Sequence, residues 1–127
     1  RMHDKYLEWL RQADYDIGTA EFMHTGGRYF YSVFMCHLAI EKAMKGLYQF
    51  KLKEVPPKTH NLVYLLNAIG IKPEERIGKF IIKLNEANIA TRYPDDLALL
   101  ERNYTEQITA EMLVQAKESL EWIKKQF

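Results

Sequence analysis

The sequence lacks several features that mark large classes of protein. It holds one cysteine, Cys36, which excludes an intramolecular disulfide framework and a zinc site built from several cysteines. No apolar run approaches the roughly 18 residues of a membrane span, so we expect no membrane segment. The opening residues RMHDKY lack the apolar stretch of a secretion signal. Together with the unpaired cysteine, this favours the cytoplasm.

An excess of one charge is also missing. The chain has 18 Lys and Arg residues against 17 Asp and Glu residues, a formal net charge of +1. A balance this even does not draw the whole molecule onto nucleic acid or a membrane, so any such binding must come from a local patch.

Sites for metals and cofactors are not indicated either. The histidines lack zinc-ligand spacing, and no Gly-rich phosphate loop or serine nucleophile elbow is present. Glu21 and His24 have the Glu-x-x-His spacing of di-iron bundles, but no second copy follows. We therefore expect no metal and no cofactor.

What the chain does have is helical periodicity. With 127 residues, 47% of them hydrophobic, we expect one compact domain over residues 1–127. Apolar residues recur at steps of three and four, with no strand-like alternation of useful length. The pattern is broken at TGG (25–27), VPPKTH (55–60), IGIKPEE (69–75) and TRYPDD (91–96). The sequence therefore predicts an all-α fold, an up-and-down antiparallel bundle of about five helices.

Turn and capping residues predict where the later helices begin and end. Thr59 is expected to cap a short helix over 62–69, which Gly70 would end. Pro73 fits the first position of the next helix. The stretch 91–104 shows no helical pattern, and irregular loops of this length in small domains are often functional.

The second helix, expected over about 28–52, is apolar on most sides and must be largely surrounded. Its central stretch HLAIEKAMKGL nevertheless carries Glu41, Lys42 and Lys45. Glu41 and Lys45 can pair across one turn, but taking each ion out of water costs several kcal/mol. Three explanations stay open: a simple pair across one turn, a binding cleft, or a homodimer interface in which the charges fix the register. The lysines either bind phosphate or lie along the edge of the core.

Three later residues add to the candidate site. His60 is able to act as an acid or base near neutral pH, or is simply a helix-start histidine with local hydrogen bonds. Arg92 offers a rigid fork for phosphate, and the ring of Tyr93 offers a surface for a base. The alternative for Arg92 is an ion pair with Glu41 or Asp16 that only fixes the loop.

Four motifs, taken in order, resemble one known family. They are Trp9, Ala13 and Asp16 in the first helix, HLAIEKAMKGL at 37–47, PPKTHNL at 56–62 and TRYPDD at 91–96. With these motifs, over about Leu7 to Ile123, the chain resembles the HEPN domain, named for higher eukaryotes and prokaryotes nucleotide-binding.

This resemblance implies a helical bundle that commonly dimerises and shares ancestry with the helical domain of kanamycin nucleotidyltransferase. Small stand-alone members are often paired with a minimal nucleotidyltransferase, as substrate-binding subunit and enzyme or as toxin and antitoxin. Other branches are metal-independent ribonucleases that carry an Arg followed four to six residues later by His. Here neither Arg92 nor Arg102 is followed by such a His.

We therefore expect a homodimeric HEPN bundle that binds a nucleotide or RNA and partners a separate nucleotidyltransferase. No complete catalytic motif is present, so the sequence leaves open whether the chain is an enzyme. Two alternatives remain: a ribonuclease toxin that brings His60 close to Arg92 in space, and a non-catalytic dimerisation module. The residues expected to line the polar groove are Glu41, Lys42, Lys45, His60, Arg92 and Tyr93.

Overall fold

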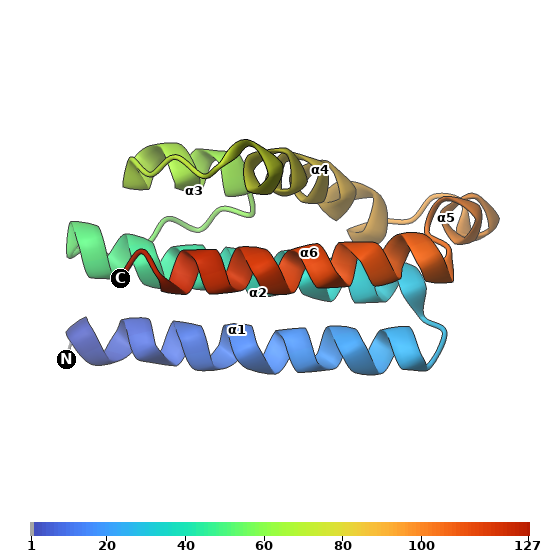
Figure 1. The fold of residues 1–127 in the computed structure, drawn as a ribbon, viewed down its shortest axis with the longest axis horizontal. Helices are drawn as coiled ribbons and strands as arrows, with labels where there is room; N and C mark the ends of the chain where they lie inside the picture. The colour runs from blue at the N-terminus through green and yellow to red at the C-terminus, as the bar shows by residue number, and fades with distance from the viewer. Residues whose placement is uncertain (1) are drawn as a thin grey trace.

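The computed structural model describes residues 2–127, with side chains from residue 5 onward. Over this part the chain forms six α-helices and no strand (Figure 1). They are α1 (Met2–Thr25), α2 (Tyr29–Leu52), α3 (Leu62–Ile69), α4 (Glu75–Arg92), α5 (Leu97–Asn103) and α6 (Glu106–Lys124). The predicted all-α fold is confirmed, with one short helix more than the sequence indicated.

Helix α2 is the centre of the bundle. It packs against each of the other five helices, as expected for a helix that is apolar on most sides. In Figure 1, α1 lies on one side of α2 and α6, while α3 and α4 lie on the other. The two chain ends lie at one end of the molecule, and the α1–α2 turn and α5 lie at the opposite end.

The core is built from aliphatic side chains of four helices around α2. Fully buried members include Ile40, Met44, Leu47, Leu65, Ile81, Leu84, Met112 and Ile123. The α1–α2 contact is tight, because a Cβ added at Gly46 would lie 3.0 Å from the Cβ of Trp9 and 3.2 Å from the carbonyl oxygen of Tyr6. A glycine in the middle of α2 is therefore explained by the close approach of α1.

Two predicted helix starts need correction, whereas the predicted stop is confirmed. Gly70 ends α3 in the left-handed conformation, with φ of 82°. The cap of α3 is Asn61, whose side chain accepts a hydrogen bond from the Tyr64 amide, while Thr59 accepts one from the Asn61 amide. Helix α4 begins at Glu75, so Pro73 precedes the helix instead of opening it.

The stretch 91–104 is not the irregular loop that the sequence suggested. Helix α4 continues to Arg92, and α5 occupies Leu97–Asn103 after an Asp96 cap that accepts from the Leu99 amide. Only Leu100 of α5 is buried. A helix of two turns with one buried residue is too short for the spacing of its apolar residues to show a helical period.

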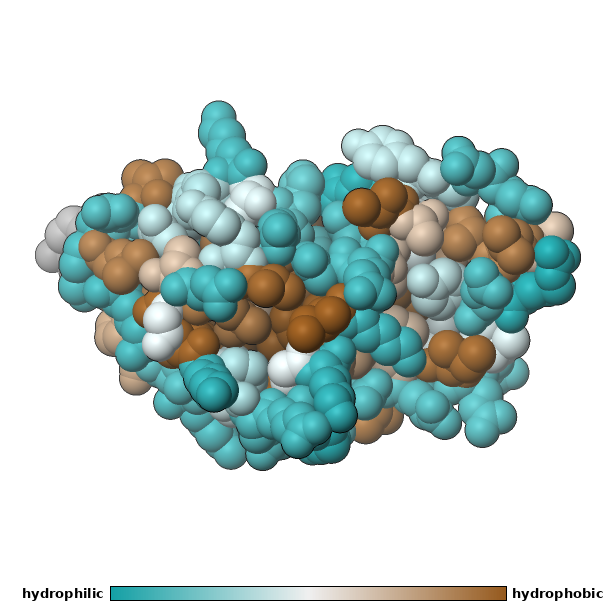
Figure 2. Space-filling model, turned by 90° about the horizontal axis from the view of Figure 1, so that it is seen from above, coloured by the Kyte–Doolittle hydropathy of each residue, from teal (hydrophilic) through white to brown (hydrophobic). Residues whose placement is uncertain are grey.

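The surface over α3, α4 and α5 is mixed in polarity. Seen from that side, hydrophilic residues predominate, and hydrophobic ones gather in the middle and at one end (Figure 2). Exposed apolar residues on these helices include Ile82, Ile89 and Leu97. Within the described residues, no helix combines the length and the apolar character needed to cross a membrane.

Candidate functional site

Glu41 is the centre of the charged stretch in α2. It is only 4% exposed, and its carboxylate accepts a hydrogen bond from Lys45 Nζ at 3.0 Å. The same carboxylate accepts from Nδ1 of His60 at 2.9 Å. His60 lies in the connection between α2 and α3 and is brought onto α2 by the turn that follows Leu52. The predicted pair of Glu41 and Lys45 is thus present, with a third partner from another segment.

His37 lies one turn before Glu41 and is fully buried. Its Nδ1 is 3.8 Å from the Glu41 carboxylate, and neither ring nitrogen reaches a described partner with normal hydrogen-bond geometry. Burial lowers the pKa of His37 to about 4, although Glu41 and the backbone of His60 favour the protonated ring. The imidazole is therefore neutral at pH 7.

Arg92 is the last residue of α4. Its guanidinium carbon lies 4.9 Å from the centroid of the Phe34 ring, within range of a cation–π contact. Its Nε is buried without a hydrogen-bond partner in the described residues, and its charge helps to keep His37 neutral. The alternative role for Arg92, an ion pair with Glu41 or Asp16, is not found among the described residues, where Glu41 pairs with Lys45 and Asp16 with Lys42.

Asn88 precedes Arg92 by one turn of α4 and is 7% exposed. Its Oδ1 also has no hydrogen-bond partner among the described residues. A buried polar group left unpaired costs about 1–3 kcal/mol, and folded proteins contain few of them. Unpaired donors and acceptors on facing helices therefore indicate a site where a ligand or an ordered water provides the missing hydrogen bonds. We refer to His37, Glu41, Lys45, His60, Asn88 and Arg92 as the polar seam.

The remaining two candidates flank the polar seam. Lys42 Nζ lies 2.9 Å from Asp16 Oδ2, which ties α2 to α1 and directs this lysine away from Glu41. Tyr93 caps the end of α4 and is 71% exposed. The structure thus brings Glu41, Lys45 and His60 into direct contact, places Arg92 beside their neighbour His37, and leaves Lys42 outside the cluster.

The seam carries more positive than negative charge. Lys45 and Arg92 are its basic side chains besides the histidines, and Glu41 is the one carboxylate among its members. Lys45 is held in place by Glu41 and lies 6.0 Å from the ring centroid of Trp9. The side chain of His60 is 54% exposed, so the seam is open to solvent at that point. Such an arrangement suits an anionic group that approaches from the His60 side.

Sequence reasoning missed two members of the seam, His37 and Asn88. The available signal for His37 was its position one turn before Glu41 on the same helix. Asn88 gave no signal, because an asparagine within an amphipathic helix is usually on the surface. Among the residues that the structure describes, no three His, Cys, Asp or Glu side chains are grouped to hold a metal ion.

Comparisons with known proteins agree with this architecture. The HEPN domain family model matches residues 6–126. The archaeal HEPN homologue ST0689 has a crystal structure that is 27% identical in sequence with a TM-score of 0.78, covering 96% of this chain and 97% of that one. The crystal structure of TT1696 from Thermus thermophilus is 23% identical with a TM-score of 0.82, covering 97% and 98%, and shows a shared fold. No curated protein matches the chain.

Proposed function

Because this chain belongs to the HEPN domain family, we propose that it is a cytoplasmic nucleotide-binding subunit that works as a homodimer with a separate minimal nucleotidyltransferase. The observation that supports this most is the polar seam. Two cations, Lys45 and Arg92, lie there with one buried carboxylate and with polar atoms that have no partner among the described residues. A phosphate group would supply the missing negative charge and acceptors for the basic side chains, whereas the Asn88 Oδ1 needs a donor from another part of the ligand or from water.

Each part of a nucleotide has a matching group in this proposal. The Arg92 guanidinium forms no ion pair with a described residue and is partly exposed, which leaves its outer nitrogens for a phosphate, and Lys45 has donors beyond the one that Glu41 accepts. The exposed ring of Tyr93, next to Arg92 in the chain, offers a face on which a base stacks. Lys42 is left as a structural partner of Asp16.

Calorimetric titration with ATP tests this assignment. We expect Arg92→Ala to weaken binding by about tenfold or more, the loss typical of a charge-assisted hydrogen bond. Arg76→Ala is the matched control, because Arg76 also lies on α4 but pairs with Glu118 of α6. Equal affinity of wild type and Arg92→Ala, or no binding by wild type, would show that the seam is not a nucleotide site.

The proposed partner requires a separate experiment. Purification of the protein from its native cells should yield a nucleotidyltransferase bound to it. Expression of each member alone and of both together then distinguishes a toxin–antitoxin pair, in which one member alone stops growth, from an enzyme and its substrate-binding subunit. Recovery of the chain without any nucleotidyltransferase would contradict the partnership.

One observation favours a second function, metal-independent ribonuclease activity. The Glu41 carboxylate accepts from His60 Nδ1, which orients the ring and leaves the other nitrogen to act as a base, while Arg92 lies in the same seam. Purified protein should then cleave single-stranded or transfer RNA in the presence of a chelator. Cleavage should disappear in His60→Ala and persist in His24→Ala. Absence of cleavage by wild type removes this function.

A further inference from the structure

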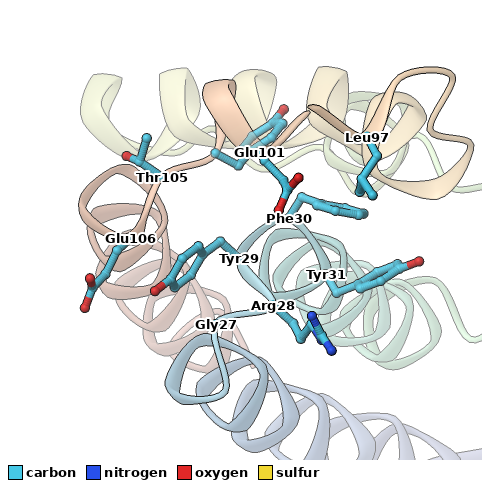
Figure 3. A pocket seen from close by; sticks show the side chains of 10 residues that line it. Gly27, Arg28, Tyr29, Phe30, Tyr31, Leu97, Glu101, Thr105 and Glu106 are labelled. Carbon is cyan, nitrogen blue, oxygen red and sulfur yellow. The ribbon is translucent and has the colours of Figure 1, made fainter. Parts of the chain in front are cut away.

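A separate cavity lies at the end of the bundle where α1 turns into α2 and α5 packs beside them (Figure 3). Its volume is about 530 Å³, within the range of small-molecule sites. None of the polar-seam residues lines it. The proposed nucleotide site therefore leaves this cavity unexplained.

The walls of the cavity are rich in aromatic rings. Tyr29, Phe30 and Tyr31 come from the first turn of α2, Tyr104 follows α5, and Leu97 begins α5. The rings of Phe30 and Tyr31 lie against each other with centroids 4.4 Å apart. Tyr31 keeps 44% of its surface exposed and Leu97 keeps 59%. Such walls suit the apolar body of a small ligand.

The cavity also carries unpaired charges of both signs. Arg28 precedes α2, Glu101 comes from α5, and neither forms an ion pair or side-chain hydrogen bond with another described residue. In Figure 3 the Glu101 carboxylate points into the space above Phe30, whereas the Arg28 guanidinium lies on the opposite side, below Tyr31. Glu106 points away from both. The two charges thus face the cavity from different walls and do not neutralise each other.

We propose that this cavity binds a small zwitterion with an apolar body, of the class formed by α-amino acids and dipeptides. The ligand carboxylate pairs with the Arg28 fork, and its ammonium group pairs with Glu101. The apolar body packs among Tyr29, Tyr31 and Leu97, whose neighbouring ring faces also attract the ammonium group. A ligand of one sign would meet a like charge on one wall, whereas a zwitterion has an opposite charge for each wall.

The experiment uses ligands that differ only in charge. L-Phenylalanine and the dipeptide phenylalanyl-alanine keep both charges, their N-acetyl forms keep the carboxylate alone, and their amide forms keep the ammonium group alone. Binding is measured by saturation-transfer NMR titration. We expect at least one of the two zwitterions to bind, and its acetyl and amide forms to bind at least tenfold more weakly.

Variants locate that binding on the two walls. Arg28→Gln and Glu101→Gln should each weaken the zwitterion at least tenfold, and circular dichroism checks that these surface changes preserve the fold. Glu106→Gln is the matched control and should leave the affinity unchanged. No binding of either zwitterion, equal binding of a singly charged form, or unchanged affinity in both variants would overturn the proposal. ATP binding is unaffected by any of these outcomes, since the two sites share no residue.

Discussion

At the scale of the residue, Glu41 explains why charge lies inside the central helix. Its carboxylate is held by Lys45 from its own helix and by His60 from the α2–α3 connection. Each partner offsets part of the cost of burying the ion, a cost of several kcal/mol when the ion is unpaired. The local pair follows from the i and i+4 spacing, but the contact with His60 depends on the fold.

Removal of this charge should therefore destabilise the protein strongly. Glu41→Gln leaves Lys45 buried without a counterion, and we expect a loss of about 3 kcal/mol in the free energy of unfolding measured with urea. The matched control is Glu75→Gln, which breaks the exposed i and i+4 pair with Lys79. That change should cost less than about 0.5 kcal/mol. Similar costs for the two variants would show that the Glu41 cluster behaves as a surface ion pair.

The same variant separates the ligand site from a dimerisation module. If the charges served only to set the register of two copies, Glu41→Gln would change the sedimentation mass and leave every ligand titration flat. We expect ATP affinity to change, because Glu41 orients both Lys45 and His60.

His37 predicts a specific pH dependence. Its pKa is about 4 in the folded protein against 6.5 for an unperturbed histidine, mainly because it is buried. Between these values the unfolded chain binds a proton that the folded chain does not, so stability is full above about pH 6.5 and falls toward pH 4. The slope from this one group approaches about 1.4 kcal/mol per pH unit.

Urea denaturation of wild type and His37→Gln over this range measures the effect. The variant should lose the part of the pH dependence that His37 contributes, whereas His24→Gln, near the end of α1, should retain it. Parallel pH profiles for wild type and His37→Gln would contradict neutral burial of this ring.

At the scale of the element, the four longer helices and α3 could be predicted from the sequence, whereas α5 could not. The sequence of α2 predicts a helix that other helices surround, because apolar residues occur on most of its faces. Helix α5 buries only Leu100 and depends on the Asp96 cap, so its sequence carries no period. The α3 start shows the same limit, since both Thr59 and Asn61 are good caps and only the chain path selects Asn61.

The α1–α2 contact predicts opposite effects for the same substitution at two helical glycines. Gly46→Ala should destabilise by about 1–2 kcal/mol, because the new methyl group meets the Cβ of Trp9 at 3.0 Å. Gly18→Ala should stabilise by about 0.5–1 kcal/mol, because nothing lies within 4 Å of the added carbon. Thermal unfolding of both variants tests this. A stabilising Gly46→Ala would mean that α1 and α2 are further apart than described.

At the scale of the whole molecule, the site could be predicted only in part. Glu41 and Lys45 could be recognised from the sequence because charge in an apolar helix is unusual, whereas His37 and Asn88 were missed. The grouping of the seam could not be predicted, because His60 and Arg92 reach His37 and Glu41 through the packing of separate segments. Arg92 shows the limit most clearly, since its neighbour is the Phe34 ring and not an acid.

The proposed homodimer also makes a prediction at this scale. Ile82 and Ile89 are exposed by 50% and 71% and lie seven residues apart on one stripe of α4. A stripe of this kind beside the seam suits contact with a second copy. Sedimentation equilibrium should give a dimer for wild type and for Val114→Glu on α6, and a monomer for Ile89→Glu. A monomeric wild type would refute the prediction.

The most direct test of the central claim, that the polar seam binds nucleotide, uses NMR signals of the histidine rings during an ATP titration. His60 belongs to the seam, whereas His24 contacts the backbone oxygen of Glu106 elsewhere in the bundle. We predict saturable shifts of the His60 ring signals that are lost in Arg92→Ala, with His24 unchanged throughout. Shifts confined to His24, or no shift of His60 at saturating ATP, would contradict the claim.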